Sequence, residues 1–260
     1  MVMYVITHKH FNYTLLPDGY KPLMVGANKN SNPDDFLTDN TGVNISDKNP
    51  SYCELTGLYW MWKNPNQNKN VGLSHYRRFF ASFNNRKSMY CKMLVSGHVN
   101  PIRTDELDAL LREGYQWIVP QPESGGPGTL WNQFDRNHNI NDLRVLEKII
   151  TQDFPDYKPA FDKYMKHSKK GSFYNMFYTT KQEMDNYCEW LFSVLSKVEL
   201  ATDISNYDKY QQRLYGFFGE RLLNVWLIKR QAQIKYLPVF NMDSAGRKQV
   251  LKLIKERIIY

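Results

Sequence analysis

Residues 71–80 are Val71-Gly72-Leu73-Ser74-His75-Tyr76-Arg77-Arg78-Phe79-Phe80. In this stretch an apolar run, typical of a buried strand, ends in a histidine and two adjacent arginines. Three potential cations at the end of such a strand need an anionic partner, because an unpaired charge in a partly buried site is costly. The planar guanidinium group of arginine suits phosphate oxygens, so a diphosphate is the natural ligand. A surface strand whose arginines pair with carboxylates would show the same residues, so the motif needs support from the rest of the chain.

Strand patterns alternate with helix patterns on both sides of this stretch, which predicts a single α/β domain. Thr7 and His8 follow the first predicted strand, where α/β nucleotide-binding domains place contacts to the base and ribose. The predicted strands are 2–7, 71–80, 116–120, 172–178 and 235–239; the predicted helices begin at Asn49-Pro50 and Thr180 and cover 104–113, 141–152, 157–167 and 208–231.

The 260-residue chain has a formal net charge of +8, which favours an anionic partner. Its lysines and arginines are dispersed, without a nucleic-acid-binding motif, so we expect no nucleic-acid partner. In the basic segment 244–260, Val250, Leu251, Ile254 and Ile258 recur at helical spacing. We therefore expect a main domain over residues 1–243 and then a basic amphipathic helix. Such a helix suits either an acidic membrane surface or docking on the protein itself.

Three isolated cysteines, Cys53, Cys91 and Cys188, have no paired spacing. This disfavours a disulfide framework and a zinc site, and it fits a reducing cytoplasm. The first residues lack the basic flank and the long apolar core of a signal peptide, and no apolar run approaches the roughly 18 residues of a membrane span. We expect a cytoplasmic protein that contacts the cytoplasmic membrane face at most peripherally.

Two segments place several functional groups at predicted helix starts. In Asp47-Lys48-Asn49-Pro50-Ser51-Tyr52-Cys53-Glu54, free backbone N–H groups at the helix start favour an anion or a sugar hydroxyl. Helix capping alone explains Asn49 and Ser51 but leaves Tyr52 and Glu54 less fully explained. The segment 130–138 combines an aromatic ring with amides, a carboxylate and a histidine, which suits sugar hydroxyls; the polar surface of an ordinary helix start would look the same.

Glu220 lies beside Gly219 in an otherwise apolar helical stretch. A carboxylate in apolar surroundings has a raised pKa and serves well as a general base. The alternative is a structural glutamate that pairs with Arg213 or Arg221. The chain has no Walker or Rossmann glycine loop, no H-E-x-x-H, no G-x-S-x-G and no Asp-x-Asp triplet.

Four segments of the chain together carry a resemblance to a known family. They are Asn44 to Trp60, Gly72 to Arg78, Asn175 to Phe177 and Glu220 to Trp226. They resemble a bacterial family long filed as a domain of unknown function and linked to capsular and exopolysaccharide synthesis. Some of its members are classed as glycosyltransferases with a GT-A-like fold, including galactofuranosyltransferases. The resemblance spans roughly residues 2–243. It implies an α/β fold: a GT-A-like, Rossmann-related nucleotide-sugar-binding domain with a mixed central sheet and additional C-terminal helices.

The resemblance also implies a UDP-sugar donor, with galactofuranose or galactose favoured, and a saccharide acceptor on a lipid carrier. The product would enter a capsule, an exopolysaccharide or an O-antigen. Most GT-A enzymes hold a divalent metal on the diphosphate with Asp-x-Asp, whereas the equivalent strand end here carries His75-Tyr76-Arg77-Arg78. We hypothesise that the histidine and both arginines stabilise the departing diphosphate directly, without a metal cofactor. The alternative is Mn²⁺ or Mg²⁺ recruited by Glu54 or Asp47.

An inverting transfer needs one carboxylate to deprotonate the acceptor hydroxyl, and Glu220 is the first candidate and Glu54 the second. The other predicted donor contacts are Thr7, His8, Asp47, Lys48 and Tyr52, and the predicted acceptor contacts are Trp131, Asn137 and His138. Two alternatives remain open: a retaining transferase of the same fold, and a non-catalytic module that binds a sugar nucleotide or a saccharide.

Overall fold

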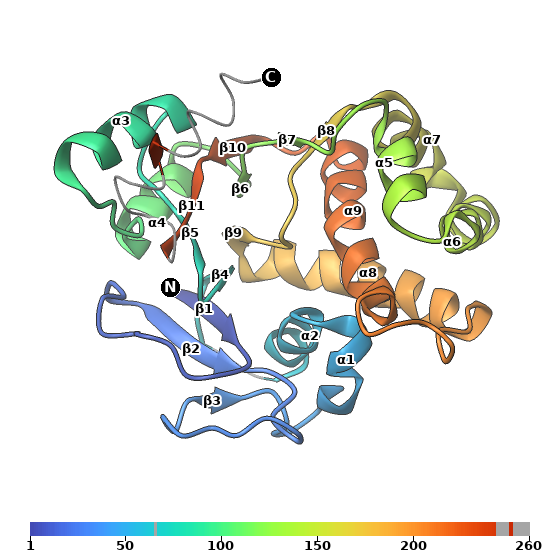
Figure 1. The fold of residues 1–260 in the computed structure, drawn as a ribbon, viewed down its shortest axis with the longest axis horizontal. Coiled ribbons are helices and arrows are strands. Elements are labelled where there is room, and N and C mark those ends of the chain that lie inside the picture. Colours follow the sequence, from blue (N-terminus) through green and yellow to red (C-terminus); the bar gives the residue numbers. More distant parts are fainter. Residues whose placement is uncertain (65–66, 243–249, 252–260) are drawn as a thin grey trace.

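A mixed β-sheet forms the centre of the molecule, and helices pack on both of its faces (Figure 1). The computed structural model describes residues 1–64, 67–242 and 250–251. Within them the sheet has nine strands, seven of which follow the order β10-β6-β9-β4-β1-β2-β3. Their bounds are β1 Val2–Thr7, β2 Tyr20–Met24, β3 Leu37–Thr38, β4 Asn70–His75, β6 Trp117–Pro120, β9 Phe177–Thr180 and β10 Ile234–Leu237. The remaining strands are β5 Arg78–Phe80 and its partner β11 Val239–Asn241, and β7 Glu123–Ser124 pairs with β8 Lys170–Gly171 in a separate ribbon.

Apolar residues that alternate along the strands fix which helices cover each face. Tyr4 and Ile6 of β1 pack in the cluster that includes α2, α8 and α9, whereas Met3 and Val5 pack with α3 and α4 on the opposite face. Figure 1 shows these two groups of helices well apart, α3 and α4 beyond β5 and β11, and α8 and α9 across the sheet. The helices are α1 Asn49–Tyr52, α2 Leu55–Lys63, α3 Arg86–Ser96, α4 Thr104–Arg112, α5 Leu130–Asn137, α6 Ile140–Asp153, α7 Lys158–Asp162, α8 Lys181–Ala201 and α9 Leu214–Lys229, with single turns at Ser46–Lys48, Pro155–Tyr157, Lys163–His167 and Gln211–Arg213.

Strand directions bring the ends of several strands to one edge of the sheet. β1 runs parallel to both β2 and β4, so their carboxyl ends lie together. β9 runs antiparallel to β4 and β6, so it begins at the same edge. The strand order reverses at β1, which has β2 on one side and the much later β4 on the other. Such a switch point leaves a crevice outside the carboxyl ends of the strands, where α/β proteins bind ligands.

The α/β fold class with a mixed sheet is confirmed, but the predicted strand over 71–80 is two strands. β4 ends at His75, the chain turns at Tyr76 and Arg77, and β5 returns antiparallel so that His75 pairs with Arg78. β5 then pairs with β11. The turn moves the histidine and both arginines out of the sheet interior and to its edge.

The predicted strand over 172–178 is also wrong over residues 172–176, because β9 begins only at Phe177. The side chain of Asn224 on α9 accepts from the backbone N–H of Ser172 and donates to its carbonyl oxygen, at 3.0 and 2.8 Å. Asn224 of α9 thus satisfies the backbone N–H and carbonyl of Ser172, which in a strand would bond to a neighbouring strand. The predicted helix over 208–231 likewise begins later, at Leu214, after the single turn at Gln211–Arg213.

The predicted amphipathic helix over 244–260 lies outside the described residues, apart from Val250 and Leu251. Across the residues that the structure does describe, no helix combines the length and the apolar character needed to cross a bilayer.

Candidate active site

A cavity of about 650 Å³ opens at the carboxyl ends of β1 and β4, at the switch point of the sheet. Five segments far apart in the sequence supply most of its walls. They are the end of β1 (Thr7, His8), the α1–α2 junction (Cys53, Glu54), the β4–β5 turn (His75 to Arg78), the residue Tyr174 before β9, and the start and first turns of α9 (Arg213, Glu220). A volume of this size holds a ligand as large as a sugar nucleotide.

Basic side chains outnumber acidic ones around this cavity. Of the described residues that line it, four are lysine or arginine and two are glutamate. Arg78 lies with its guanidinium carbon 4.5 Å from the centroid of the Tyr174 ring, and Arg213 Nε donates to Cys53 Sγ at 3.2 Å. Stacking and sulfur contacts leave most of the donors of a guanidinium available to phosphate oxygens.

His75 adds no positive charge to the cavity near neutral pH. Its Nε2 lies 2.5 Å from the backbone carbonyl oxygen of Tyr174, and because a carbonyl only accepts, the proton is on Nε2. Burial, helped by the nearby Arg78 and Arg213, lowers the pKa of His75 to about 4, although the Tyr174 carbonyl and Glu220 oppose the shift. The three potential cations expected from the sequence are therefore two arginines and one neutral imidazole.

Both glutamates of the cavity are held in surroundings that favour their protonated forms. Burial raises the pKa of Glu220, and Glu54 raises it further, while Arg221 opposes the shift. Burial likewise raises the pKa of Glu54, opposed first by a hydrogen bond from Asn175 and also by Arg213 and Arg78. Carboxylates whose pKa values lie nearer to neutral pH are better general bases than exposed ones.

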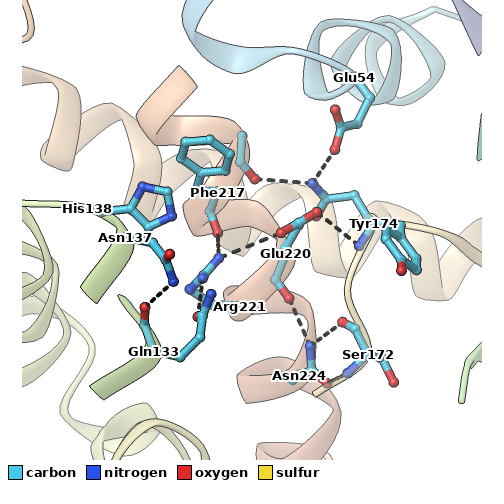
Figure 2. Close-up of polar contacts among 12 residues, drawn as sticks. Glu54, Gln133, Asn137, His138, Ser172, Tyr174, Phe217, Glu220, Arg221 and Asn224 are labelled. Atoms are coloured by element: carbon cyan, nitrogen blue, oxygen red, sulfur yellow. Dashed lines mark hydrogen bonds and ion pairs between the residues drawn. The ribbon is translucent and has the colours of Figure 1, made fainter. Parts of the chain in front are cut away.

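Figure 2 shows that both carboxylates are joined to the segment that precedes β9. The backbone N–H of Tyr174 donates to Glu220 Oε1 at 3.0 Å, and Asn175 Nδ2 donates to Glu54 Oε1 at 2.7 Å. Glu220 also lies 3.6 Å from Arg221 Nη1, whose guanidinium is buried and bonded to the carbonyl of Phe217. The sequence left open that Glu220 is a structural glutamate paired with Arg221. That pair accounts for Oε2 of Glu220, whereas Oε1 accepts the hydrogen bond from Tyr174 at the cavity.

Two glycines let α9 approach the α1–α2 junction closely. A Cβ atom on Gly216 would lie 3.1 Å from Cys53 Sγ, and one on Gly219 would lie 2.8 Å from Leu55 Cδ1. A Cβ atom at either position would require the neighbouring side chain to shift, so glycine is the residue that fits without rearrangement. The close approach places Glu220, the next residue, beside Glu54.

Of the residues predicted from the sequence, the structure gathers Thr7, His8, Glu54, His75, Arg77, Arg78 and Glu220 around the cavity. Asp47, Lys48 and Tyr52 do not line it. Asp47 accepts from Asn28 on the surface, and Lys48 and Tyr52 both contact Glu199.

The three predicted acceptor residues on and after α5 do not line the cavity. Trp131 packs under Lys166, and Asn137 donates to the carbonyl of Gln133. His138 lies among the rings of Phe134, Phe217 and Tyr210. Burial lowers the pKa of His138 to about 4.

Several cavity residues were not singled out as site residues from the sequence: Cys53, Tyr174, Lys209, Gln212, Arg213 and Asn241. Arg213 was named only as a partner of Glu220, and its position one helical turn before Phe217 and two before Glu220 was a usable signal. Tyr174 carried no such signal, because its role depends on a backbone conformation.

In the part of the chain that the structure describes, His, Cys, Asp and Glu side chains nowhere gather in groups of three or more suited to a metal ion.

Comparison with known proteins gives one family and one solved structure. No curated protein matches the chain. The apo structure of WbbM, a bifunctional glycosyltransferase, is similar with a TM-score of 0.79 and 28% identity over 92% of this chain. This chain spans only 44% of the WbbM chain. The family described as "Domain of unknown function (DUF4422)" matches residues 2–231, so the chain belongs to the DUF4422 family.

Proposed function

We propose that this protein is a glycosyltransferase that moves a hexosyl group from a UDP-sugar to a saccharide acceptor. The observation that carries the proposal is a single cavity at the sheet's switch point that holds two arginines of one turn together with two partly buried glutamates. A nucleotide diphosphate needs the cations, and activation of an acceptor hydroxyl needs a carboxylate. The similarity to a glycosyltransferase supports this class of reaction. Galactofuranose or galactose as the sugar, and a lipid carrier for the acceptor, remain expectations from the resemblance.

The proposed reaction inverts the configuration at the anomeric carbon. Glu220 takes the proton of the acceptor hydroxyl, whose oxygen forms a bond to the anomeric carbon. The bond from that carbon to the phosphate oxygen breaks, and UDP leaves with the electron pair. Arg77, Arg78 and Arg213 stabilise the negative charge that develops on the diphosphate. Glu54 is the second candidate for the base.

We further propose that the transfer needs no divalent metal. The basic side chains of the cavity supply the charge that a metal supplies in most enzymes of the implied fold. The alternative, Mn²⁺ or Mg²⁺ recruited by Glu54, predicts loss of activity on chelation.

Release of UDP from a panel of UDP-sugars, with and without EDTA, tests these two proposals. The panel contains UDP-galactofuranose, UDP-galactose, UDP-glucose and UDP-N-acetylglucosamine, each with a simple sugar acceptor. We expect acceptor-dependent release that survives EDTA. Activity that EDTA abolishes and manganese restores would overturn the metal-free site but keep the enzyme. UDP binding without turnover of any donor would favour a non-catalytic binding module, and the anomeric proton of the product distinguishes inversion from retention.

Aromatic rings next to the cavity suit the saccharide acceptor. Phe217 lies on α9 between Arg213 and Glu220, at a spacing that puts all three on one face of the helix. The ring of Tyr210 lies 5.1 Å from that of Phe217 and 5.9 Å from that of His138, and its side chain is 52% exposed. An exposed aromatic ring that lies in the chain between the cavity-lining residues Lys209 and Gln212 is a place for a sugar ring to stack.

Tyr210→Ala is therefore expected to raise the acceptor KM about 3- to 10-fold, because a stacked aromatic ring contributes about 0.5–1.5 kcal/mol. The affinity for UDP should not change. Tyr236→Ala is the matched control, since Tyr236 is a comparably exposed tyrosine on β10, on a different element from the ring cluster of Tyr210, Phe217 and His138. Initial rates at varied acceptor concentration give the KM of each variant, and an equal KM for both would contradict the proposed acceptor site.

A further inference from the structure

Two consecutive residues before β9 have backbone conformations that favour glycine, yet neither is glycine. Tyr174 has φ 80° and Asn175 has φ 51°. Asparagine adopts positive φ several-fold more often than most residues, but a bulky aromatic residue there is an outlier. Backbone strain of this kind persists only where surrounding contacts hold it in place, and it gathers at functional sites.

The contacts of this two-residue turn connect it to three titratable residues of the cavity, Glu220, His75 and Glu54. The N–H of Tyr174 bonds to Glu220, and its carbonyl accepts from His75. The side-chain amide of Asn175 donates to Glu54 and, at 3.2 Å, to the carbonyl of Gly216 on α9. The turn therefore joins α9, the end of β4 and the α1–α2 junction, which the sequence separates widely.

The turn is itself held from both sides. Asn224 on α9 fixes the backbone of Ser172 just before it. The ring of Tyr174 lies against Arg78, and its hydroxyl donates to Glu123 at 2.9 Å, which in turn pairs with Arg86. Asn175 is only 2% exposed, so its amide bonds to Glu54 in a place shielded from solvent.

We propose that Tyr174 and Asn175 are positioning residues, whose turn holds Glu54, Glu220 and His75 in the one arrangement that the transfer reaction needs. The inference rests on the proposed glycosyltransferase function. Only Tyr174 reaches the cavity surface, and Asn175 acts through Glu54.

Hydrogen bonds from this turn also set the charge of the carboxylates. A hydrogen bond to an ionised carboxylate favours the charged form, so the Asn175 amide opposes the rise in the pKa of Glu54 that burial causes. The other charged or titratable groups that act on Glu54 are Arg213, Arg78 and Glu220, with the thiol of Cys53 adjacent. Loss of the amide leaves all of these in place, and the pKa of Glu54 then rises further.

Asn175→Gly is the decisive variant, because glycine keeps the positive φ and removes only the amide. We expect the pKa of Glu54 to rise by about one unit, since hydrogen bonds to charged groups are worth about that much. Titration of the ¹³C-labelled Glu δ-carboxyl resonances measures this pKa, and Glu54→Gln identifies the resonance. Asn175→Asp keeps the size of the side chain, replaces the donor with a second carboxyl group, and is expected to raise the pKa more. Asn64→Gly is the control, because its amide bonds to the carbonyls of Val43 and Trp60 and does not line the cavity.

In the enzyme, the acid limb of the pH dependence of kcat/KM should move to lower pH in Asn175→Gly, because Glu220 is the proposed base and a more protonated Glu54 repels its negative charge less. A residue with only a structural role would lower activity equally at every pH. An unchanged Glu54 titration in both Asn175 variants overturns the inference. If the wild-type protein binds UDP but turns over no donor, the proposed function fails, while the Glu54 titration still decides whether Asn175 positions that carboxylate.

Discussion

Glu220→Gln is expected to lower kcat by about 10²–10⁴-fold, the usual contribution of a general base, while the affinity for UDP stays within about threefold. Glutamine has the same size, and its Oε1 still accepts the N–H of Tyr174, so the turn before β9 is kept. The amide cannot take a proton, however. Because burial and Glu54 raise the pKa of Glu220, this carboxylate holds a proton more readily than an exposed glutamate and is the better base.

The measurements are kcat with saturating donor and acceptor, and the Kd of UDP by calorimetry. Glu147→Gln is the control, because Glu147 pairs with Lys158 and Lys166 and does not line the cavity. If Glu54→Gln loses kcat and Glu220→Gln keeps it within tenfold, Glu54 is the base. If both variants keep kcat, neither carboxylate deprotonates the acceptor.

The parts of the site that the sequence predicted follow from local rules. The apolar run up to Ser74 predicted a buried strand, and the carboxyl end of a strand is where α/β folds bind ligands, so the residues from His75 to Arg78 lie at the cavity. A lone carboxylate in an apolar helix predicted a special environment for Glu220, and its pKa is indeed raised.

The positions of the residues around Asn49, which the sequence predicted wrongly in part, depend on a break in the helix that begins there. The predicted helix from Asn49 is two helices, because α1 ends at Tyr52 and Cys53 has a φ of 52°. α1 is thus a single turn. Asn49 and Pro50 at its start line the cavity, whereas Lys48 just before them pairs with Glu199 outside it. The break also turns Glu54 inward, toward Asn175.

The turn at Tyr174 and Asn175 could not be predicted from neighbouring residues at all. Its conformation is fixed by contacts with residues 41 to 121 positions away along the chain, on α9 and at the α1–α2 junction. The run of aromatic and apolar residues over 172–178 is typical of a strand, and only the packed structure shows that Asn224 replaces the neighbouring strand at Ser172. Local sequence patterns therefore predict where the strands end at this site. The conformation of the turn at Tyr174 and Asn175, and with it the positions of both glutamates, depends on contacts between residues far apart in the sequence.

Replacing Arg77 and Arg78 together by methionine is expected to raise the Kd of UDP about 10²–10⁴-fold, because each hydrogen bond to a charged group is worth about 1.5–3 kcal/mol. The salt dependence of UDP binding should fall as well, since two charges are removed. Lys48→Met is the matched control: this lysine is also basic and was also predicted to bind the donor, but it pairs with Glu199 outside the cavity.

Calorimetric titration with UDP at two salt concentrations separates the possible outcomes for these arginines. Arg78→Lys keeps the charge and loses the planar donor pair, so we expect it to restore only part of the affinity that Arg78→Met loses. Far-UV circular dichroism of each variant checks the fold, because Arg78 also packs on Tyr174. An unchanged Kd in the double variant would mean that the two arginines pair with the protein's own groups, as in the surface-strand alternative. A raised Kd with an unchanged kcat would place them in donor binding but not in stabilising the departing diphosphate.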